Sequence, residues 1–147
     1  MDETDIKILK ILAENANTTS TEIGQVVGLS IPAVNKRIQK LQQEQVIRQF
    51  TIVADREKVG KQVQAFILVI LQSADAATQL LEYVKKEPDV LECHAVTGEY
   101  DYLIKVCAAD IRALEEMLLC LKKQKGVIKS HTMLGLMEHK FSPTALP

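Results

Sequence analysis

The stretch that decides the fold runs from Thr19 to Gln45 and reads T-S-T-E-I-G-Q-V-V-G-L-S-I-P-A-V-N-K-R-I-Q-K-L-Q-Q-E-Q. Thr19 fits a helix N-cap, because the carboxylate of Glu22 stands three residues on and can bond back to the cap N–H. Gly28 can end this helix in the left-handed conformation, which a residue without Cβ adopts at low cost. Ser30 can then cap a second helix by accepting from first-turn N–H groups. The pattern predicts two short helices joined by a tight turn.

The second of these helices has two different faces. Val34, Ile38 and Leu41 recur at helical spacing and must face a core. The far side and its flanks hold Pro32 together with the amides and cations Asn35, Lys36, Arg37, Gln39, Lys40 and Gln43. Lys and Arg neutralise phosphates or bond guanine edges, and Asn and Gln pair with adenine. A solvated helix could look the same, but the order of caps and turn favours a helix-turn-helix that enters a DNA groove.

Length and charge bound what the chain can be. Its 147 residues suffice for one medium domain or two small ones. The formal net charge of -1 excludes a generally basic nucleic-acid binder, so DNA affinity must come from a local patch. Residues 30–48 supply such a patch, with four cations against the single Glu44.

The cysteines and the apolar runs exclude other classes. Cys93, Cys107 and Cys120 make an odd count without C-x-x-C spacing, which predicts reduced thiols in a cytoplasmic protein and neither a disulfide framework nor a metal site. The longest apolar run, 65–71, has seven residues, whereas a bilayer span needs about 20. We expect no membrane association and no cofactor.

The segments around the central stretch complete the N-terminal domain. Asp2 can cap a first helix that runs to about Asn15. Residues 46–53 are apolar with polar interruptions and predict a strand or short wing. The charged run D-R-E-K-V-G-K then ends near a glycine, which is typical of a domain boundary. The expected organisation is a DNA-binding domain at 1–54, a linker at 55–62 and a second domain at 63–147.

The second domain repeats one pattern. Strands are predicted at 63–72, 90–97, 102–109 and 127–137, and amphipathic helices at 74–87 and 111–124. Asp75 and Asp110 stand at the two helix starts, where a carboxylate meets the positive end of the helix dipole. Two βαβ halves predict a ferredoxin-like βαββαβ domain with an antiparallel sheet. The expected fold class is α+β, with a winged helix-turn-helix joined to this domain.

The first strand of the second domain implies a partner. Its core, A-F-I-L-V-I-L at 65–71, is apolar at every position and shows no alternation that would mark a wet face. Two helices cover only one face of the sheet, so we expect a second copy to cover the other and form a homodimer. A twofold pair of helix-turn-helix units matches a pseudo-palindromic site on double-stranded DNA.

A loop between the central strands offers a candidate ligand site. Thr97 to Asp101 reads T-G-E-Y-D. Gly98 lets backbone approach a ligand, Glu99 and Asp101 offer carboxylates to an ammonium group, and Tyr100 offers a wall and a hydroxyl. The same residues also fit a capped turn in which Asp101 bonds local N–H groups.

The chain resembles the leucine-responsive and asparagine-regulator group (Lrp/AsnC) of prokaryotic transcription factors. The resemblance covers nearly the whole chain. It is carried by D-x-x-I-L-x-x-L from Asp5 to Leu12, E-I-x-x-x-V-G-L-S from Glu22 to Ser30, V-x-K-R-I-x-x-L from Val34 to Leu41, V-I-R from Val46 to Arg48, and T-G-E-Y-D-Y-L-I-K-V from Thr97 to Val106.

The resemblance implies an amino-acid-sensing regulator that is cytoplasmic and nucleoid-associated. Its dimers would assemble into octamers or other rings, with a small effector, usually an amino acid, between neighbouring dimers. The implied DNA-binding residues are Ser30, Pro32, Asn35, Lys36, Arg37 and Lys40. The implied effector-binding residues are Gly98, Glu99, Tyr100 and Asp101, with Ser130 and Thr132 contributed by a neighbouring subunit. The family commonly has glycine where this chain has Gln45, so Gln45 must adopt a left-handed conformation or end the helix differently.

The alternative function is a stand-alone amino-acid sensor or chromatin-architectural assembly protein without a ligand-controlled promoter. Catalysis is not expected, because His94, His131 and His139 have no nucleophile signature and no glycine-rich phosphate loop near them.

Overall fold

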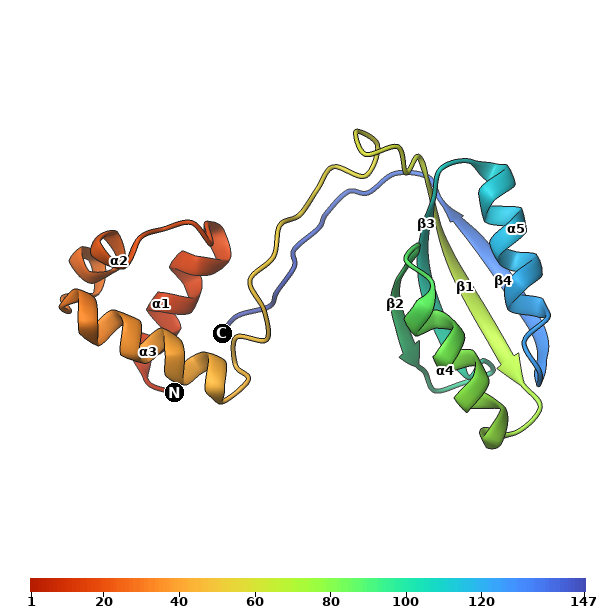
Figure 1. The fold of residues 1–147 in the computed structure, drawn as a ribbon, viewed down its shortest axis with the longest axis horizontal. Coiled ribbons are helices and arrows are strands. Elements are labelled where there is room, and N and C mark those ends of the chain that lie inside the picture. The colour runs from red at the N-terminus through yellow and green to blue at the C-terminus, as the bar shows by residue number, and fades with distance from the viewer. The chain divides into compact units, whose positions relative to one another are not determined.

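The computed structural model describes residues 1–147, which divide into two compact units. The first unit comprises residues 1–53 and 140–147, and the second comprises residues 54–139. The first is built of helices, and the second is a sheet covered by helices (Figure 1). No helix in either unit has the length and apolar character needed to cross a bilayer.

The first unit contains three helices: α1 (Glu3–Glu14), α2 (Ser20–Val27) and α3 (Ile31–Gln43). Asp2 caps α1 and shares a capping box with Asp5, in which each backbone N–H donates to the other residue's carboxylate at 2.9 Å. Thr19 and Glu22 form the expected capping box of α2, with the Thr19 N–H 2.7 Å from the Glu22 carboxylate. The predicted helices and both early caps are confirmed.

The turn between α2 and α3 is held by backbone contacts. Gly28 has φ 70°, the left-handed conformation that the sequence predicted. The Leu29 N–H donates to the Gly24 carbonyl at 3.0 Å, and a Cβ on Gly24 would lie 2.5 Å from the Leu29 carbonyl oxygen. Residue 24 therefore has to be glycine for the chain to turn this tightly.

Ser30 occupies the N-cap position of α3, but the predicted side-chain cap is wrong. Its backbone is extended, with ψ 154°, and its side chain makes no capping hydrogen bond. A cap side chain bonds the N–H of the second or third helical residue. Pro32 is the second residue and has no N–H, so half of the possible donors are missing.

The three helices enclose a small core. Ile8, Ile23 and Val34 are fully buried at 0% exposure, one from each helix, and Leu41 closes the end of α3 at 2%. Gln45 then takes a left-handed conformation with φ 58°, the first of the two outcomes expected for a non-glycine residue there.

The predicted strand or wing at 46–53 is not formed in the single chain. The segment has no regular secondary structure, and Ile52 and Val53 are 86% and 62% exposed. A strand needs a neighbour to accept and donate its backbone hydrogen bonds, and this segment pairs with no other strand of the chain.

The second unit confirms the βαββαβ order. Its strands are β1 (Val63–Leu71), β2 (Val90–Ala95), β3 (Tyr102–Ala108) and β4 (Val127–Gly135). Its helices are α4 (Ala77–Lys86), preceded by the 3-10 turn η1 (Ala74–Ala76), and α5 (Ile111–Lys122). The strand order is β2-β3-β1-β4 with every pair antiparallel, and both helices lie on one face (Figure 1).

The helix starts of the second unit differ from each other. The Asp110 carboxylate stands at the start of α5, as predicted, and caps the helix by accepting from the Ala113 N–H at 2.8 Å. Asp75 does not cap α4. The chain enters α4 through η1, so the N-cap position falls on Ala76, which has no side-chain acceptor.

The register of the strands gives the sheet two distinct faces. Ile67 pairs with Ile104 and Thr132, and this set faces the helices, where Ile67 and Ile104 are 0% exposed. The next residue, Phe66, pairs with Lys105 and Met133 on the opposite face. We call the second face the open face. It consists of Gln64, Phe66, Leu68, Ile70, Glu92, His94, Leu103, Lys105, Cys107, Lys129, His131 and Met133.

Candidate nucleic-acid interface and effector loop

One face of α3 is polar and exposed while the other is buried. We call the exposed side the recognition face. It consists of Pro32, Asn35, Lys36, Gln39, Lys40 and Gln43, all of them exposed. Val34 and Leu41 hold the opposite side in the core of the first unit. The recognition face therefore has a fixed direction and offers amides and ammonium groups to a ligand outside the unit.

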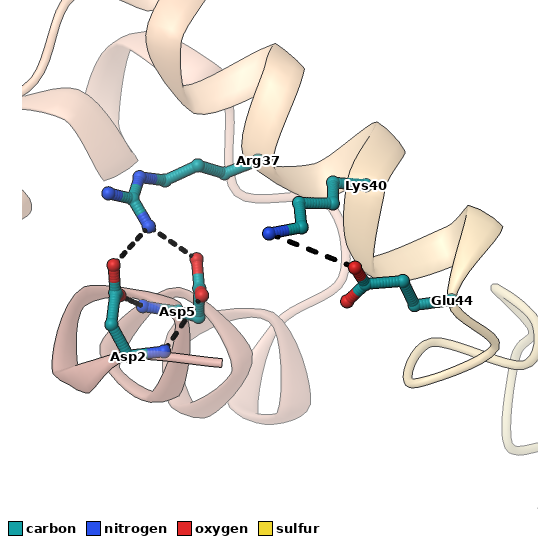
Figure 2. A network of polar contacts seen from close by, with 5 residues as sticks. All are labelled: Asp2, Asp5, Arg37, Lys40 and Glu44. Atoms are coloured by element: carbon teal, nitrogen blue, oxygen red, sulfur yellow. Dashed lines mark hydrogen bonds and ion pairs between the residues drawn. The ribbon is translucent and has the colours of Figure 1, made fainter.

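The side chains of the recognition face differ in how they are held. The Ser20 hydroxyl donates to the Asn35 side-chain oxygen, which links α2 to α3 and orients the Asn35 amide. The Lys40 ammonium lies 3.7 Å from the Glu44 carboxylate one turn further along α3 (Figure 2). This exposed pair is weak in water, so Lys40 can exchange Glu44 for a phosphate at little cost.

Arg37 is placed differently from the other predicted DNA-binding residues. Its Nη1 lies 2.8 Å from the Asp2 carboxylate and 2.6 Å from the Asp5 carboxylate (Figure 2). The backbone N–H of Asp2 and the Arg37 guanidinium both lower the pKa of Asp5, although burial opposes them. Arg37 is thus bonded to α1, whereas Ser30, Pro32, Asn35, Lys36 and Lys40 lie exposed.

The predicted effector loop forms the turn between β2 and β3. Gly98 has φ 112°, and Gly98 and Glu99 are exposed. The Asp101 carboxylate accepts from the Leu71 N–H at 2.7 Å, and the Asp101 N–H donates to the Val69 carbonyl at 2.9 Å. Asp101 therefore caps the end of β1. Its carboxylate bonds an N–H 30 residues away, and not the local N–H groups of the capped-turn alternative.

Ser130 and Thr132 lie on β4, which pairs with β1, the strand to which Asp101 of this loop is hydrogen-bonded. They pair with Val69 and Ile67, so they face the helices. His131 between them lies on the open face, with its ring centroid 6.4 Å from that of Tyr100. The two-residue alternation of a strand places His131 on the opposite face from Ser130 and Thr132.

Neither the recognition face nor the β2–β3 turn has the features of a metal centre. No group of three or more His, Cys, Asp or Glu side chains is placed to hold a metal ion. Cys93, Cys107 and Cys120 are all free thiols, and burial raises the pKa of the Cys93 and Cys107 thiols.

A helix-turn-helix with an outward cationic helix, followed by a separate α+β domain, is the arrangement of a DNA-binding regulator with a second, regulatory domain. Comparison with known families agrees. Residues 1–48 match the winged helix-turn-helix DNA-binding family, and residues 64–145 match the Lrp/AsnC ligand binding domain. The chain belongs to the Lrp/AsnC family of transcriptional regulators.

Similar proteins align with the chain along nearly its whole length. The HTH-type transcriptional regulator FL11 of Pyrococcus horikoshii is 34% identical over 147 residues, which cover 100% of this chain and 96% of the relative. A transcriptional regulator of Neisseria meningitidis, solved in complex with L-Met, is 34% identical with TM-score 0.93 and covers 99% of this chain and 96% of its own. AsnC of E. coli is 27% identical with TM-score 0.90, covering 98% and 97%. The Pyrococcus horikoshii and Neisseria meningitidis proteins are both named as transcriptional regulators.

Proposed function

We propose that the chain binds a pseudo-palindromic operator through the recognition face of α3 and changes its assembly or DNA affinity when a small amino acid binds at the β2–β3 turn. The observation that carries the proposal is the fixed, exposed set of amides and cations on α3, on a helix whose other side is buried. It is joined in one chain to a domain of the Lrp/AsnC ligand-binding type.

In this proposal the residues of the recognition face divide by chemistry. Lys36 and Lys40 neutralise phosphates, which supplies affinity and salt dependence. Asn35 directly precedes Lys36 and presents an amide, the group that pairs with adenine in the major groove. Ser30 and Pro32, at the exposed start of α3, lie where a recognition helix meets the DNA.

A second copy of the chain completes the second unit in the proposal. Phe66, Leu68 and Ile70 lie in a row along the open face, only half-buried, and Met133 beside them is 42% exposed. Contact between two open faces removes this apolar surface from water. The dimer also presents two copies of α3 to two half-sites. In keeping with the family resemblance, dimers associate further into octamers or larger rings.

The proposed effector is an amino acid that meets the exposed end of the β2–β3 turn. The Neisseria meningitidis relative was solved with L-Met, which supports an amino acid here as well. The exposed Glu99 carboxylate suits the ammonium group, Gly98 gives the backbone room, and Tyr100 with His131 forms an aromatic wall. In an assembly, Ser130 and Thr132 contribute from a neighbouring subunit. The effector must bind one arrangement of dimers more tightly than another, since equal affinity shifts nothing.

The proposal is tested by titrating amino acids against a defined operator. The operator is selected from random-sequence duplexes with the full-length protein, and its complex is followed by mobility shift and light scattering. We expect at least one amino acid to change affinity or assembly, and Glu99→Gln to remove that response while leaving ligand-free operator binding intact. Glu115→Gln, on the exposed side of α5, is the matched control that keeps the response.

Two results contradict the effector proposal. If no amino acid changes operator affinity or particle size, the chain does not sense amino acids. If the response survives Glu99→Gln, the effector binds elsewhere.

A further inference from the structure

The start of α1 and the middle of α3 are joined by one ionic network. Asp2 and Asp5 hold each other through the capping box of α1, and both carboxylates meet the same Nη1 atom of Arg37 (Figure 2). The partners of Arg37 are 35 and 32 residues away along the chain. The network therefore fixes tertiary structure and not only a helix end.

Asp5 is the most buried member of this network, and it depends on Arg37 for a cationic partner. The Asp5 side chain is 9% exposed, compared with 32% for Arg37 and 56% for Asp2. A carboxylate that is nearly buried is costly unless a cation pairs with it. Arg37 is the cation in contact with Asp5, so moving the guanidinium away to a phosphate would leave Asp5 unpaired.

The local charge also disfavours a DNA contact by Arg37. One guanidinium faces two carboxylates, so the group carries net negative charge. A hollow of ≈ 440 Å³ between the start of α1 and α3 is lined by these three residues together with Met1, Ala33, Lys36 and Lys40. The two lysines that line this hollow, Lys36 and Lys40, belong to the recognition face.

We propose that Arg37 is a positioning residue that ties α3 to the capping box of α1 and sets the angle at which the recognition face meets DNA. The inference rests on the proposed DNA-binding role of that face and revises the expectation that Arg37 touches DNA itself. Its action on DNA passes through Lys36 and Lys40, whose directions depend on where α3 lies against α1.

Asp2→Asn distinguishes a DNA-contacting Arg37 from a positioning Arg37, because the two roles change operator affinity in opposite directions. Asn caps a helix about as well as Asp, so the substitution keeps α1 capped and removes only the charge that faces Arg37. If Arg37 contacts DNA, loss of a competing carboxylate strengthens operator binding. If Arg37 positions α3, operator binding weakens, by about two- to fivefold for a partly exposed ion pair.

The measurement is operator affinity of the full-length protein by fluorescence anisotropy, well below its unfolding temperature, beside affinity for random-sequence duplexes. Glu44→Gln is the matched control, since it removes the same charge beside Lys40 without touching the network. We expect Glu44→Gln to strengthen binding and Asp2→Asn to weaken it. Asp2→Asn should add no further loss to Arg37→Gln, because the two share one interaction.

Three results overturn the inference. Stronger operator binding by Asp2→Asn makes Arg37 a DNA contact. A lower melting temperature with unchanged operator affinity makes the network purely structural. Additive losses in the double variant show that Asp2 and Arg37 act separately. A different result would contradict the DNA-binding role of the recognition face itself: operator affinity that does not change when Lys36 and Lys40 are replaced by Ala.

Discussion

Replacing Gly24 by Ala should destabilise the helix-turn-helix, although alanine favours helices. At a solvent-exposed position inside a helix, replacing Gly by Ala stabilises the helix by about 1 kcal/mol. Here the new Cβ would lie 2.5 Å from the Leu29 carbonyl oxygen, closer than the 3.0 Å that real Cβ contacts essentially never go below. The oxygen belongs to the backbone of the turn and cannot rotate away.

The size of the loss follows from the contacts that must change. Forcing an extra methyl group into a packed site costs about 1–3 kcal/mol. Moving Leu29 also strains its 3.0 Å hydrogen bond to the Gly24 carbonyl, which contributes about 1 kcal/mol. With the helix-propensity gain subtracted, Gly24→Ala should destabilise the first unit by about 1–3 kcal/mol.

Hydrogen exchange measures this loss in the full-length protein, because two units need not unfold in one step. Protection of the Ile23 and Val34 amides should fall roughly 5- to 150-fold. The amides of β1, in the second unit, serve as the internal reference and should not change. Thr21→Ala, at an exposed position of the same helix, should leave protection equal or slightly higher. If Gly24→Ala raises protection as Thr21→Ala does, the close approach at Leu29 is not rigid and the reasoning fails.

Two further predictions concern the dimer and acid stability. Leu68→Glu places a charge in the middle of the open face and should give a monomer by light scattering. Leu119→Glu, on the exposed side of α5, should leave the dimer intact. Equal masses for the two variants would refute the face-to-face dimer. A hydrogen bond from the Asp2 N–H lowers the pKa of Asp5, and hydrogen bonds from Thr19 lower the pKa of Glu22. The two carboxylates therefore stabilise the folded state above their ordinary pKa values of 3.8 and 4.5, and this stabilisation is lost as the pH falls through the lowered pKa values. Melting of the first unit followed by circular dichroism should therefore shift to lower temperature below about pH 4, less so in Asp5→Asn; an equal shift in that variant would assign the acid sensitivity elsewhere.

The helices and the four strands of the second unit could be predicted from sequence because their signals are local. The Thr19–Glu22 capping box, the left-handed Gly28 and the Asp110 cap each depend on residues within a few positions of one another. The βαββαβ order follows from periodicity that changes at the same places as these caps. Where a competing local constraint existed, as with Pro32 two residues after Ser30, the prediction of a cap failed.

The rest depends on contacts between distant residues or on partners outside the single chain. The pairing of Arg37 with Asp5 and of Asp101 with Leu71 joins residues 32 and 30 positions apart, which no window of sequence reveals. The segment 46–53 has strand composition, but its backbone finds no pairing within one chain. The site residues on α3, by contrast, could be proposed from sequence, because a buried helical stripe fixes which side chains face outward.

The central claim is that the recognition face of α3 binds DNA, and the salt dependence of operator affinity tests it most directly. Each phosphate contact contributes about -0.9 to the slope of log affinity against log salt. A dimer holds two copies of Lys36, so Lys36→Ala should make the slope less steep by about 2, and Lys40→Ala should act similarly. Lys123→Ala, an exposed cation just after α5, should leave the slope unchanged. Slopes of Lys36→Ala and Lys40→Ala equal to that of the unsubstituted protein would contradict the account.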